Sequence, residues 1–325
     1  IYVEATADIC EVDTRTVQRL LEKAGKRAAD FHNLQLEKLE APLDVVQMDE
    51  LHGKTVKSRQ DKTTLVKVPK KLRSGSIKKG QNVASYGSGG KKPFLLESII
   101  GPRTLETALQ LTASVAVYAK DKDPPLILID DHLPYPQAIL QIFGEIKHGR
   151  RKNARGRFKY PRLKPPEDLQ VGVVKKLRDE RGHLLNVSSK ALFGKKKAIE
   201  KRIRKLGIGQ TINTSHMERL NGTIRGQQAR LIRRTRAGSH LQEMLQYSIW
   251  LWRDLYNWTR VHYSLMDQTP AMALGLADEV WSALKYILYP VHVSDLVRQD
   301  WTEQRNSVLE SAVDLYKRNK ALPIS

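Results

Sequence analysis

Three acidic residues, Asp49, Asp130 and Glu218, stand in sequence surroundings that suit metal chemistry. Asp49 follows the largely apolar run at residues 45–48, and Asp130 directly follows the apolar run at residues 126–129. Such runs predict buried strands, in which a carboxylate is costly unless a cation lies beside it. Glu218 lies near the start of a segment with helical periodicity. Because carboxylate oxygens prefer hard cations, these residues favour Mg²⁺ or Mn²⁺.

Each acid also has a structural explanation that the residues alone leave open. The first acid is compatible with a strand end at which the side chain caps a turn. Ser215 and Glu218 fit a capping box, in which the serine accepts from a helix amide and the glutamate bonds back to the cap. Asp131 competes with Asp130 for the second position. Glu50 is a weaker candidate than the acid before it, because strand alternation turns it to the opposite face.

The segment around Glu218 predicts an amphipathic helix that continues into a series of arginines. Its apolar side comprises Met217, Leu220, Ile224 and Leu231. Its polar side combines Glu218 with Asn221 and later cations. Arginine suits phosphate because its planar fork donates two parallel hydrogen bonds. We therefore predict DNA contacts from four arginines: Arg225, Arg230, Arg233 and Arg234.

The charge balance favours a polyanionic partner. Among 325 residues, 56 are Lys or Arg and 35 are Asp or Glu, which gives a formal net charge of +21. A chain of this length is able to bury a large core and to hold more than one domain. The single cysteine, Cys10, excludes an intrachain disulfide and a cysteine-rich zinc site. The sequence contains no membrane-spanning apolar run and no signal peptide, so we expect a cytoplasmic protein without membrane contacts.

Two stretches of the chain are dense in cations. Residues 54–92 mix Lys with Gly and Ser, which predicts a long polar loop or extended hairpin that either follows a DNA backbone or is simply solvated. Residues 147–164 contain no acid, and the rings of Phe158 and Tyr160 suit stacking on unpaired bases. We predict DNA contacts from five residues of this second stretch: Arg150, Arg151, Lys152, Arg155 and Arg157.

The N-terminal segment, residues 1–41, predicts short helices. Residues 5–9 end a first helix, a second begins at Asp13 or Thr14 and stops at Gly25, and a connecting helix spans residues 31–40.

This N-terminal arrangement resembles the second half of a helix-turn-helix, with Arg15 and Arg19 exposed toward DNA. A structural helix that packs on the following domain fits equally well. The chain starts at Ile1 rather than methionine, so we expect that this DNA-binding segment is truncated.

Further elements follow from apolar periodicity and turn residues. The long helix at residues 239–262 has a predicted core face formed by Leu241, Leu245, Ile249, Trp252 and Leu255. The other predicted elements are a strand at 94–100, a helix at 105–120, a β-hairpin from 171–178 and 183–192, a basic helix at 195–205, a strand at 286–293 and a helix at 303–316.

Four groups of residues carry a resemblance to a known family. They are Met48-Asp49-Glu50-Leu51, the run 126–130 with Tyr135 five residues on, the run 214–221 with Glu218, and the run from Tyr256-Asn257 through His262 to Thr269-Pro270-Ala271. In these motifs the chain resembles the DDE-type insertion-sequence transposases, members of the retroviral-integrase superfamily with an RNase H-like core. The resemblance covers most of the chain from about Val45 to Leu276.

The resemblance implies an α/β fold: an RNase H-like mixed sheet flanked by helices, with a β-hairpin and basic insertion before the last catalytic helix. It implies a catalytic domain at residues 42–276, with the insertion at about 147–205, and a C-terminal appendage at residues 277–325. Asp49, Asp130 and Glu218 would be the catalytic residues and would hold two Mg²⁺ or Mn²⁺ ions. Asp130 is preferred to Asp131 because of its spacing to Tyr135, although the family often has glycine after this acid.

The implied activity is metal-dependent cleavage at element ends, followed by transfer of the 3′-hydroxyl into target DNA. The implied partners are double-stranded DNA, as element ends and as target, and further copies of the chain in a homodimer or higher oligomer. A prokaryotic, nucleoid-associated location would follow. Two alternatives stay open: a nuclease of the same core that does not transfer strands, and a DNA-binding protein whose acids are inactive.

Overall fold

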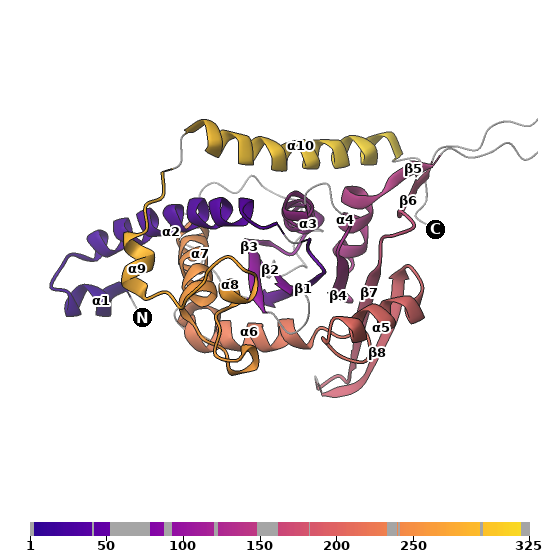
Figure 1. Cartoon of the computed structure of the whole chain (residues 1–325), viewed down its shortest axis with the longest axis horizontal. Coiled ribbons are helices and arrows are strands. Elements are labelled where there is room, and N and C mark those ends of the chain that lie inside the picture. The colour runs from indigo at the N-terminus through magenta and orange to yellow at the C-terminus, as the bar shows by residue number, and fades with distance from the viewer. Residues whose placement is uncertain are drawn as a thin grey trace, which may run out of the picture.

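The computed structural model describes residues 3–40, 42–52, 79–87, 93–119, 123–147, 162–181, 183–232, 239, 241–292 and 295–319. In this part of the chain, a six-stranded mixed sheet is flanked by helices, which confirms the predicted α/β class (Figure 1). The order of the strands across the sheet is β3-β2-β1-β4-β7-β8. Their bounds are β1 Val45–His52, β2 Lys79–Gly87, β3 Phe94–Pro102, β4 Leu126–Asp130, β7 Val171–Arg178 and β8 Leu184–Phe193.

The helices and minor strands complete the element order. The α-helices are α1 Val3–Ile9, α2 Thr14–Glu37, α3 Leu105–Ala119, α4 Pro134–Phe143, α5 Lys196–Lys205, α6 Ser215–Gln227, α7 Gln242–Thr259, α8 Pro270–Ala273, α9 Ala283–Leu288 and α10 Asp295–Asn319. Two short 3₁₀ helices are η3 Ala229–Leu231 and η4 Tyr263–Leu265, and β5 Glu145–Lys147 pairs with β6 Arg162–Lys164. No helix among the described residues is both long and apolar enough to cross a lipid bilayer.

The centre of the sheet is parallel and buried on both faces. β4 lies between β1 and β7 and runs parallel to both. The four apolar residues of β4 before Asp130 are completely buried, as their continuous run predicts. Met48 pairs with Ile129, and Asp130 pairs with Val174. The next position along β1 is Asp49, so Asp49 and Asp130 lie on neighbouring strands at the point where the pairing of β1 with β4 ends.

Strand alternation sorts the sheet's side chains onto two helical layers. Val46, Met48, Ile127 and Ile129 pack with residues of α2, α3 and α4. The opposite face packs against α5, α6 and α7, through apolar residues that include Leu51, Leu126 and Leu128. Asp49 alternates onto this second face. The helix that carries Glu218 therefore covers the same face of the sheet as Asp49.

The N-terminal helices differ from the prediction at Gly25. The cap at Asp13 is confirmed, since its side chain accepts from the Arg15 N–H at 2.7 Å. However, α2 continues through Gly25 to Glu37 as one helix. A Cβ at Gly25 would lie 2.3 Å from the Cβ of Tyr247, so the glycine permits close contact with α7 and does not end the helix. The sequence alone did not show this packing partner.

Several other elements depart from the sequence prediction. β2 lies within the polar stretch 54–92 and pairs with β1 and β3 as an interior strand of the sheet; the rest of that stretch lies outside the described residues. β7 and β8 form the β-hairpin predicted at 171–178 and 183–192, but both are strands of the central sheet although they lie within the expected insertion at 147–205. Residues 283–288 form α9, so the strand predicted at 286–293 is wrong. Leu241 is 63% exposed and does not belong to the core face of α7, whereas Leu245, Ile249 and Trp252 do.

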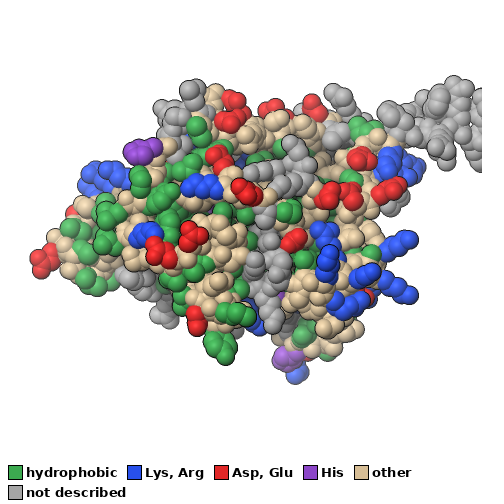
Figure 2. All heavy atoms as spheres, viewed as in Figure 1, with side chains coloured by type: hydrophobic (Ala, Val, Ile, Leu, Met, Phe, Trp, Pro, Cys, Tyr) green, Lys and Arg blue, Asp and Glu red, His purple; other side chains and the backbone are tan. Residues whose placement is uncertain are grey.

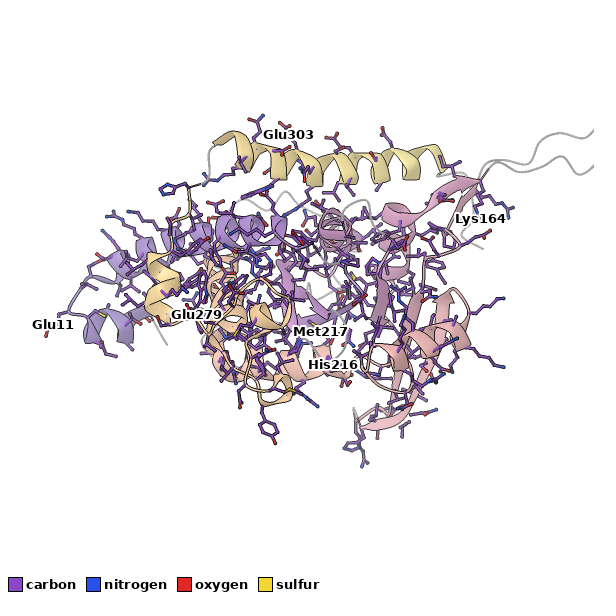
Figure 3. The ribbon with its side chains drawn as sticks, in the orientation of Figure 1. Glu11, Lys164, His216, Met217, Glu279 and Glu303 are labelled. Carbon is purple, nitrogen blue, oxygen red and sulfur yellow. The ribbon has the colours of Figure 1, made fainter. Side chains whose placement is uncertain are left out.

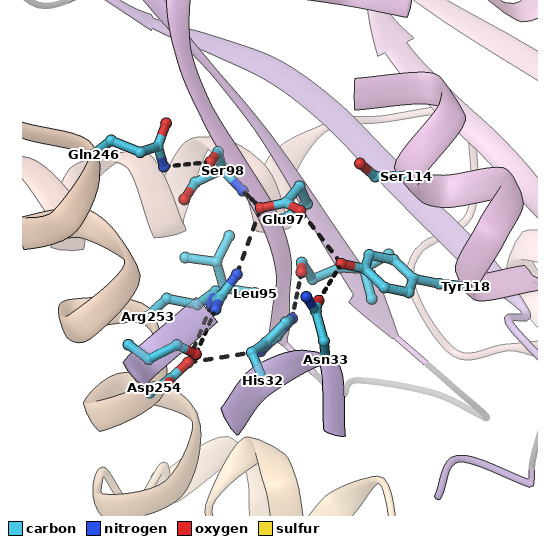
Figure 4. Close-up of polar contacts among 12 residues, drawn as sticks. His32, Asn33, Leu95, Glu97, Ser98, Ser114, Tyr118, Gln246, Arg253 and Asp254 are labelled. Atoms are coloured by element: carbon cyan, nitrogen blue, oxygen red, sulfur yellow. Dashed lines mark hydrogen bonds and ion pairs between the residues drawn. The ribbon is translucent and has the colours of Figure 1, made fainter. Parts of the chain in front are cut away.

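A buried polar cluster joins α2, β3 and α7 (Figure 4). The Arg253 guanidinium donates to Asp254 Oδ1 at 3.1 Å and to the carbonyl of Ala28 at 3.2 Å, and it contacts Glu97 at 3.4 Å. His32 donates from Nε2 to the carbonyl of Leu96 at 2.6 Å. Burial raises the pKa of Asp254 to about 7, against the opposing effect of Arg253. The packing of α2 on the sheet therefore depends on charges that compensate one another.

Asn257 of α7 attaches that helix to the sheet. Its amide donates to the Leu95 carbonyl and accepts from the Leu95 N–H, both at 3.0 Å. The side chain is completely buried and bonds to a strand as a neighbouring strand would. This geometry gives Asn257 a supporting role in the fold.

Candidate active site

Two carboxylates lie where the parallel pairing between β1 and β4 ends. Asp49 and Asp130 are consecutive to the last paired residues, Met48 and Ile129. The Asp49 carboxylate accepts from the N–H of Glu50 at 2.7 Å, and Asp130 accepts from the N–H of Asp131 at 2.8 Å. Both acids are therefore fixed by the backbone of the residue that follows them. Ligand sites in α/β sheets commonly form at the carboxyl ends of strands.

α6 brings the third acid to the same place. Gln47 of β1 accepts from the Met217 N–H at 3.0 Å, so a strand residue satisfies one of the unpaired amides in the first turn of α6. One turn further, Asn221 donates to Asp49 Oδ2 at 2.8 Å. Figure 3 shows Met217 at the start of α6, near the middle of the molecule. These two hydrogen bonds fix the helix so that Glu218 lies beside the two aspartates.

The electrostatics of Asp49 show that the three acids act on one another. Burial raises the pKa of Asp49 to about 6, and the negative charges of Asp130 and Glu218 raise it further. The hydrogen bond from the Glu50 N–H and the charge of Lys176 oppose this rise. A carboxylate in such surroundings favours a proton or a cation. The sequence pattern thus brings its three predicted acids together.

Replacing Asp49 with Asn is expected to stabilise the metal-free protein at pH 8. The pKa of Asp49 in the folded protein is raised above its unfolded value of 3.8. The protonated form of Asp49 therefore contributes its full stability to the folded protein below pH 4, and this stability is lost as pH rises through about 6. Two pKa units correspond to on the order of 3 kcal/mol. Denaturant unfolding in EDTA should show Asp49→Asn above wild type at pH 8, with the gain lost near pH 4. An equal difference at both pH values would contradict this account.

Glu218 contacts a hydroxyl group and an ammonium group. The Thr214 hydroxyl donates to Glu218 Oε1 at 3.0 Å, and the Lys176 ammonium lies 2.6 Å from the same oxygen. The proposed capping box is not formed, because Thr214 is the N-cap and Ser215 donates instead to Asn213 Oδ1 at 2.7 Å. The glutamate therefore contacts both the Lys176 side chain of β7 and the side chain of the N-cap residue, Thr214.

The two rival acids lie elsewhere. Glu50 is buried, forms an ion pair with Arg103, and has one carboxylate oxygen 2.5 Å from His132 Nε2. Strand alternation places Glu50 on the opposite face of the sheet from Asp49, as predicted. Asp131 is exposed and lies 3.7 Å from the Lys175 ammonium. The structure therefore brings Asp130 to Asp49 and Glu218, and places Asp131 and Glu50 apart from them.

The predicted DNA-binding residues are scattered. Arg15 and Arg19 are exposed near the start of α2, which Figure 1 places at the opposite end of the molecule from β7. Arg225 lies in α6, but the helix ends at Gln227 and Arg230 lies in η3, so the predicted continuous arginine helix is wrong. Seven residues lie outside the described part of the chain: Arg150, Arg151, Lys152, Arg155, Arg157, Arg233 and Arg234.

The donor set at this site consists of carboxylate oxygens, which hard divalent cations prefer. Among the described residues, no three Asp, Glu, His or Cys side chains converge tightly enough to ligate one common ion. However, Asp49 lies between two further acids whose charges act on it. Oxygen donors of this kind match Mg²⁺, which keeps much of its water and takes few protein carboxylates. The residues present therefore fit Mg²⁺ or Mn²⁺.

Three residues of the site were missed by sequence reasoning. Gln47 is a polar residue inside a buried strand and lies two positions before Asp49, a spacing that places it on the same face. This spacing was a usable signal. Thr214 and Lys176 could not be found in this way, because the first depends on where α6 begins and the second on the register between β7 and β4.

The comparisons add no relative to this description. No protein-family model, no curated protein and no solved structure matches the chain.

Proposed function

We propose that this protein is a DDE-type DNA transposase with an RNase H-like core. The observation that carries the proposal is the meeting of Asp49, Asp130 and Glu218, which are far apart in sequence, on one face of a mixed sheet. The order β3-β2-β1-β4-β7, with acids on two neighbouring parallel strands and on a later helix, supports an RNase H-like arrangement. The resemblance in sequence motifs supports the same assignment independently.

Two Mg²⁺ or Mn²⁺ ions would be held by the three acids, with Asp49 shared and Asp130 and Glu218 each completing one site. When bound, such a pair of ions activates the attacking oxygen and stabilises the leaving oxygen of a phosphodiester. The chain's own contribution is positioning. Asn221 orients one oxygen of Asp49, and Gln47 fixes the start of α6 against β1.

The reaction class follows from this arrangement. Water or a DNA 3′-hydroxyl attacks the phosphorus and gives up its proton to solvent, while the opposite P–O bond breaks and the departing 3′-oxygen takes up a proton to become a 3′-hydroxyl. The same centre would first cut the element end and then join the freed 3′-hydroxyl to target DNA. None of these steps requires a covalent protein–DNA intermediate. Asp49 would stay ionised during the reaction, because bound cations favour its charged form.

A basic surface beside the site supports DNA as the partner. Six cations of α5 and its cap are exposed: Lys195, Lys196, Lys197, Lys201, Arg204 and Lys205. Figure 2 shows Lys and Arg gathered at the side of the molecule where Figure 1 places α5 and β5–β6. Two turns of such a helix suit the phosphates of a duplex, which neutralise the cations and release counterions. We further propose that two or more copies of the chain act together, since two element ends must be joined.

An end-cleavage assay tests the proposed function. The full chain is incubated with labelled duplexes that carry the DNA flanking its gene, with Mg²⁺ or with EDTA, and with a plasmid target. A transposase cuts at a defined position and joins the 3′ end to the plasmid only when Mg²⁺ is present. Cutting without joining would favour the nuclease. Binding that is the same with and without Mg²⁺, and that leads to no cutting, would favour an inactive DNA-binding protein.

A further inference from the structure

Among the described side chains of β7, only Lys176 places a charged group at the carboxylate site. It lies two positions beyond Val174, which pairs with Asp130. Val174 packs with α5 on the face that carries the site, so alternation points Lys176 to that face as well. Its side chain is 18% exposed, and its ammonium lies 2.6 Å from Glu218 Oε1.

Lys175 provides a natural comparison within the same strand. It points to the opposite face, where its ammonium lies 3.7 Å from Asp131 and its side chain is 58% exposed. An ion pair of this kind, between solvated groups, contributes little. Lys176 is more shielded and nearer to its acid, and its charge also acts on Asp49. The two lysines thus have the same chemistry but different environments.

The Lys176 ammonium occupies space beside Glu218 that a metal ion bound to this residue would require. An ion shared by Glu218 and Asp49 requires a Glu218 oxygen, and Oε1 is already engaged by Thr214 and by the Lys176 ammonium. An ammonium group and a divalent ion cannot both occupy the space next to this oxygen without strong repulsion. The fold does not need the ion pair to hold β7, because β4 and β8 already pair with that strand.

We propose that Lys176 is a built-in counter-ion, which occupies the cation position beside Glu218 in the metal-free protein and is displaced when a divalent ion binds. This inference rests on the metal site of the proposed function. Lys176 holds three neighbouring acids together before the ions arrive, and it weakens the binding of metal in the absence of DNA. Its flexible side chain allows the ammonium to turn away, toward the phosphates of a bound DNA strand.

Removing the charge of Lys176 is expected to tighten metal binding. Mn²⁺ titrations of the full chain without DNA, followed by the electron paramagnetic resonance signal of free Mn²⁺, compare wild type with Lys176→Met. The variant should bind about tenfold more tightly, since one nearby positive charge no longer opposes the ion. It should also melt at a lower temperature than wild type in EDTA, because three acids lose their counter-ion, and Mn²⁺ should restore its stability.

Matched variants separate this role from general electrostatics. Lys175→Met removes the same charge one residue away and should leave Mn²⁺ affinity within about twofold of wild type. Lys176→Arg keeps the charge and should behave as wild type. Asp49→Asn should abolish the binding that is measured, which identifies the ions as those of the site.

Two results would overturn the proposal in distinguishable ways. If Asp49→Asn abolishes Mn²⁺ binding while wild type and Lys176→Met bind equally, the metal site stands and Lys176 is not its counter-ion. If neither wild type nor Lys176→Met binds Mn²⁺, or if the Mn²⁺ that they bind is also bound by Asp49→Asn, the metal site and the role of Lys176 both fail.

Discussion

Glu218→Gln is expected to reduce Mg²⁺-dependent cleavage and joining by about a thousandfold or more, because losing one group that acts on the reacting phosphate commonly costs that much. Gln keeps the shape of the side chain and can still accept from Thr214. It loses the negative charge that would hold an ion. Glu218 is 48% exposed, and removing its charge leaves Lys176 to act on Asp49, so the variant should fold normally.

The measurement for Glu218 pairs activity with binding. Rates of cleavage and joining are measured with the labelled duplex and Mg²⁺. Affinity for the same duplex is measured in EDTA, which prevents cleavage so that DNA binding is measured alone. Glu200→Gln is the matched control, since Glu200 is a helical glutamate paired with a lysine, Lys196, at 3.9 Å outside the site. Cleavage by Glu218→Gln within tenfold of wild type would remove this residue from the metal site.

Arg253→Met is expected to cost about 3–5 kcal/mol of unfolding free energy, the range seen when one partner of a buried charge pair is removed. Arg253 is 2% exposed and contacts Asp254 and Glu97, which are also buried. Without the guanidinium, Asp254 keeps only uncharged donors such as the Tyr286 hydroxyl, 2.9 Å from Oδ2. The methionine fills much of the volume but leaves the carboxylates without their nearest cation.

The loss in Arg253→Met should depend on pH. Asp254 already has a pKa of about 7, raised by burial above its ordinary value and held down by Arg253. Removing Arg253 raises it further, so the folded variant retains the proton to a higher pH, and its stability falls as pH rises through the new value. Denaturant unfolding should therefore show a larger loss at pH 8 than at pH 5. Arg260→Met, an exposed arginine just after α7, is the control. A loss below about 1 kcal/mol at pH 8 would contradict the cluster's role.

Patterns of apolar residues within short stretches of the sequence predicted individual strands and helices. The apolar run before Asp130 gave a central strand, and the spacing of Met217, Leu220 and Ile224 gave the buried face of α6. A continuous apolar run suits a strand that is covered on both faces, and the spacing in α6 matches the period of a helix. The position of an acid at the end of a buried strand was therefore visible in the sequence.

The remaining features depend on partners that are distant in sequence. From the sequence alone Gly25 predicts a helix end, but in the structure it allows Tyr247 to pack closely against the helix. β2 is a strand because β1 and β3 pair with it, although its residues are polar and rich in small side chains. Lys176 faces the site only because β7 pairs with β4 in one particular register. Tertiary pairing decided each of these cases, and no local window of sequence contains that information.

The choice between Asp130 and Asp131 offers the most direct test of the central claim. The two acids are adjacent in sequence, yet Asp130 acts on Asp49 while Asp131 lies beside Lys175. The measurement compares Mg²⁺-dependent cleavage and joining by Asp130→Asn and Asp131→Asn on the same labelled ends. A three-acid catalytic site predicts that Asp130→Asn is inactive and that Asp131→Asn retains near wild-type rates. Equal activity of the two variants, or loss of activity in Asp131→Asn alone, would contradict it.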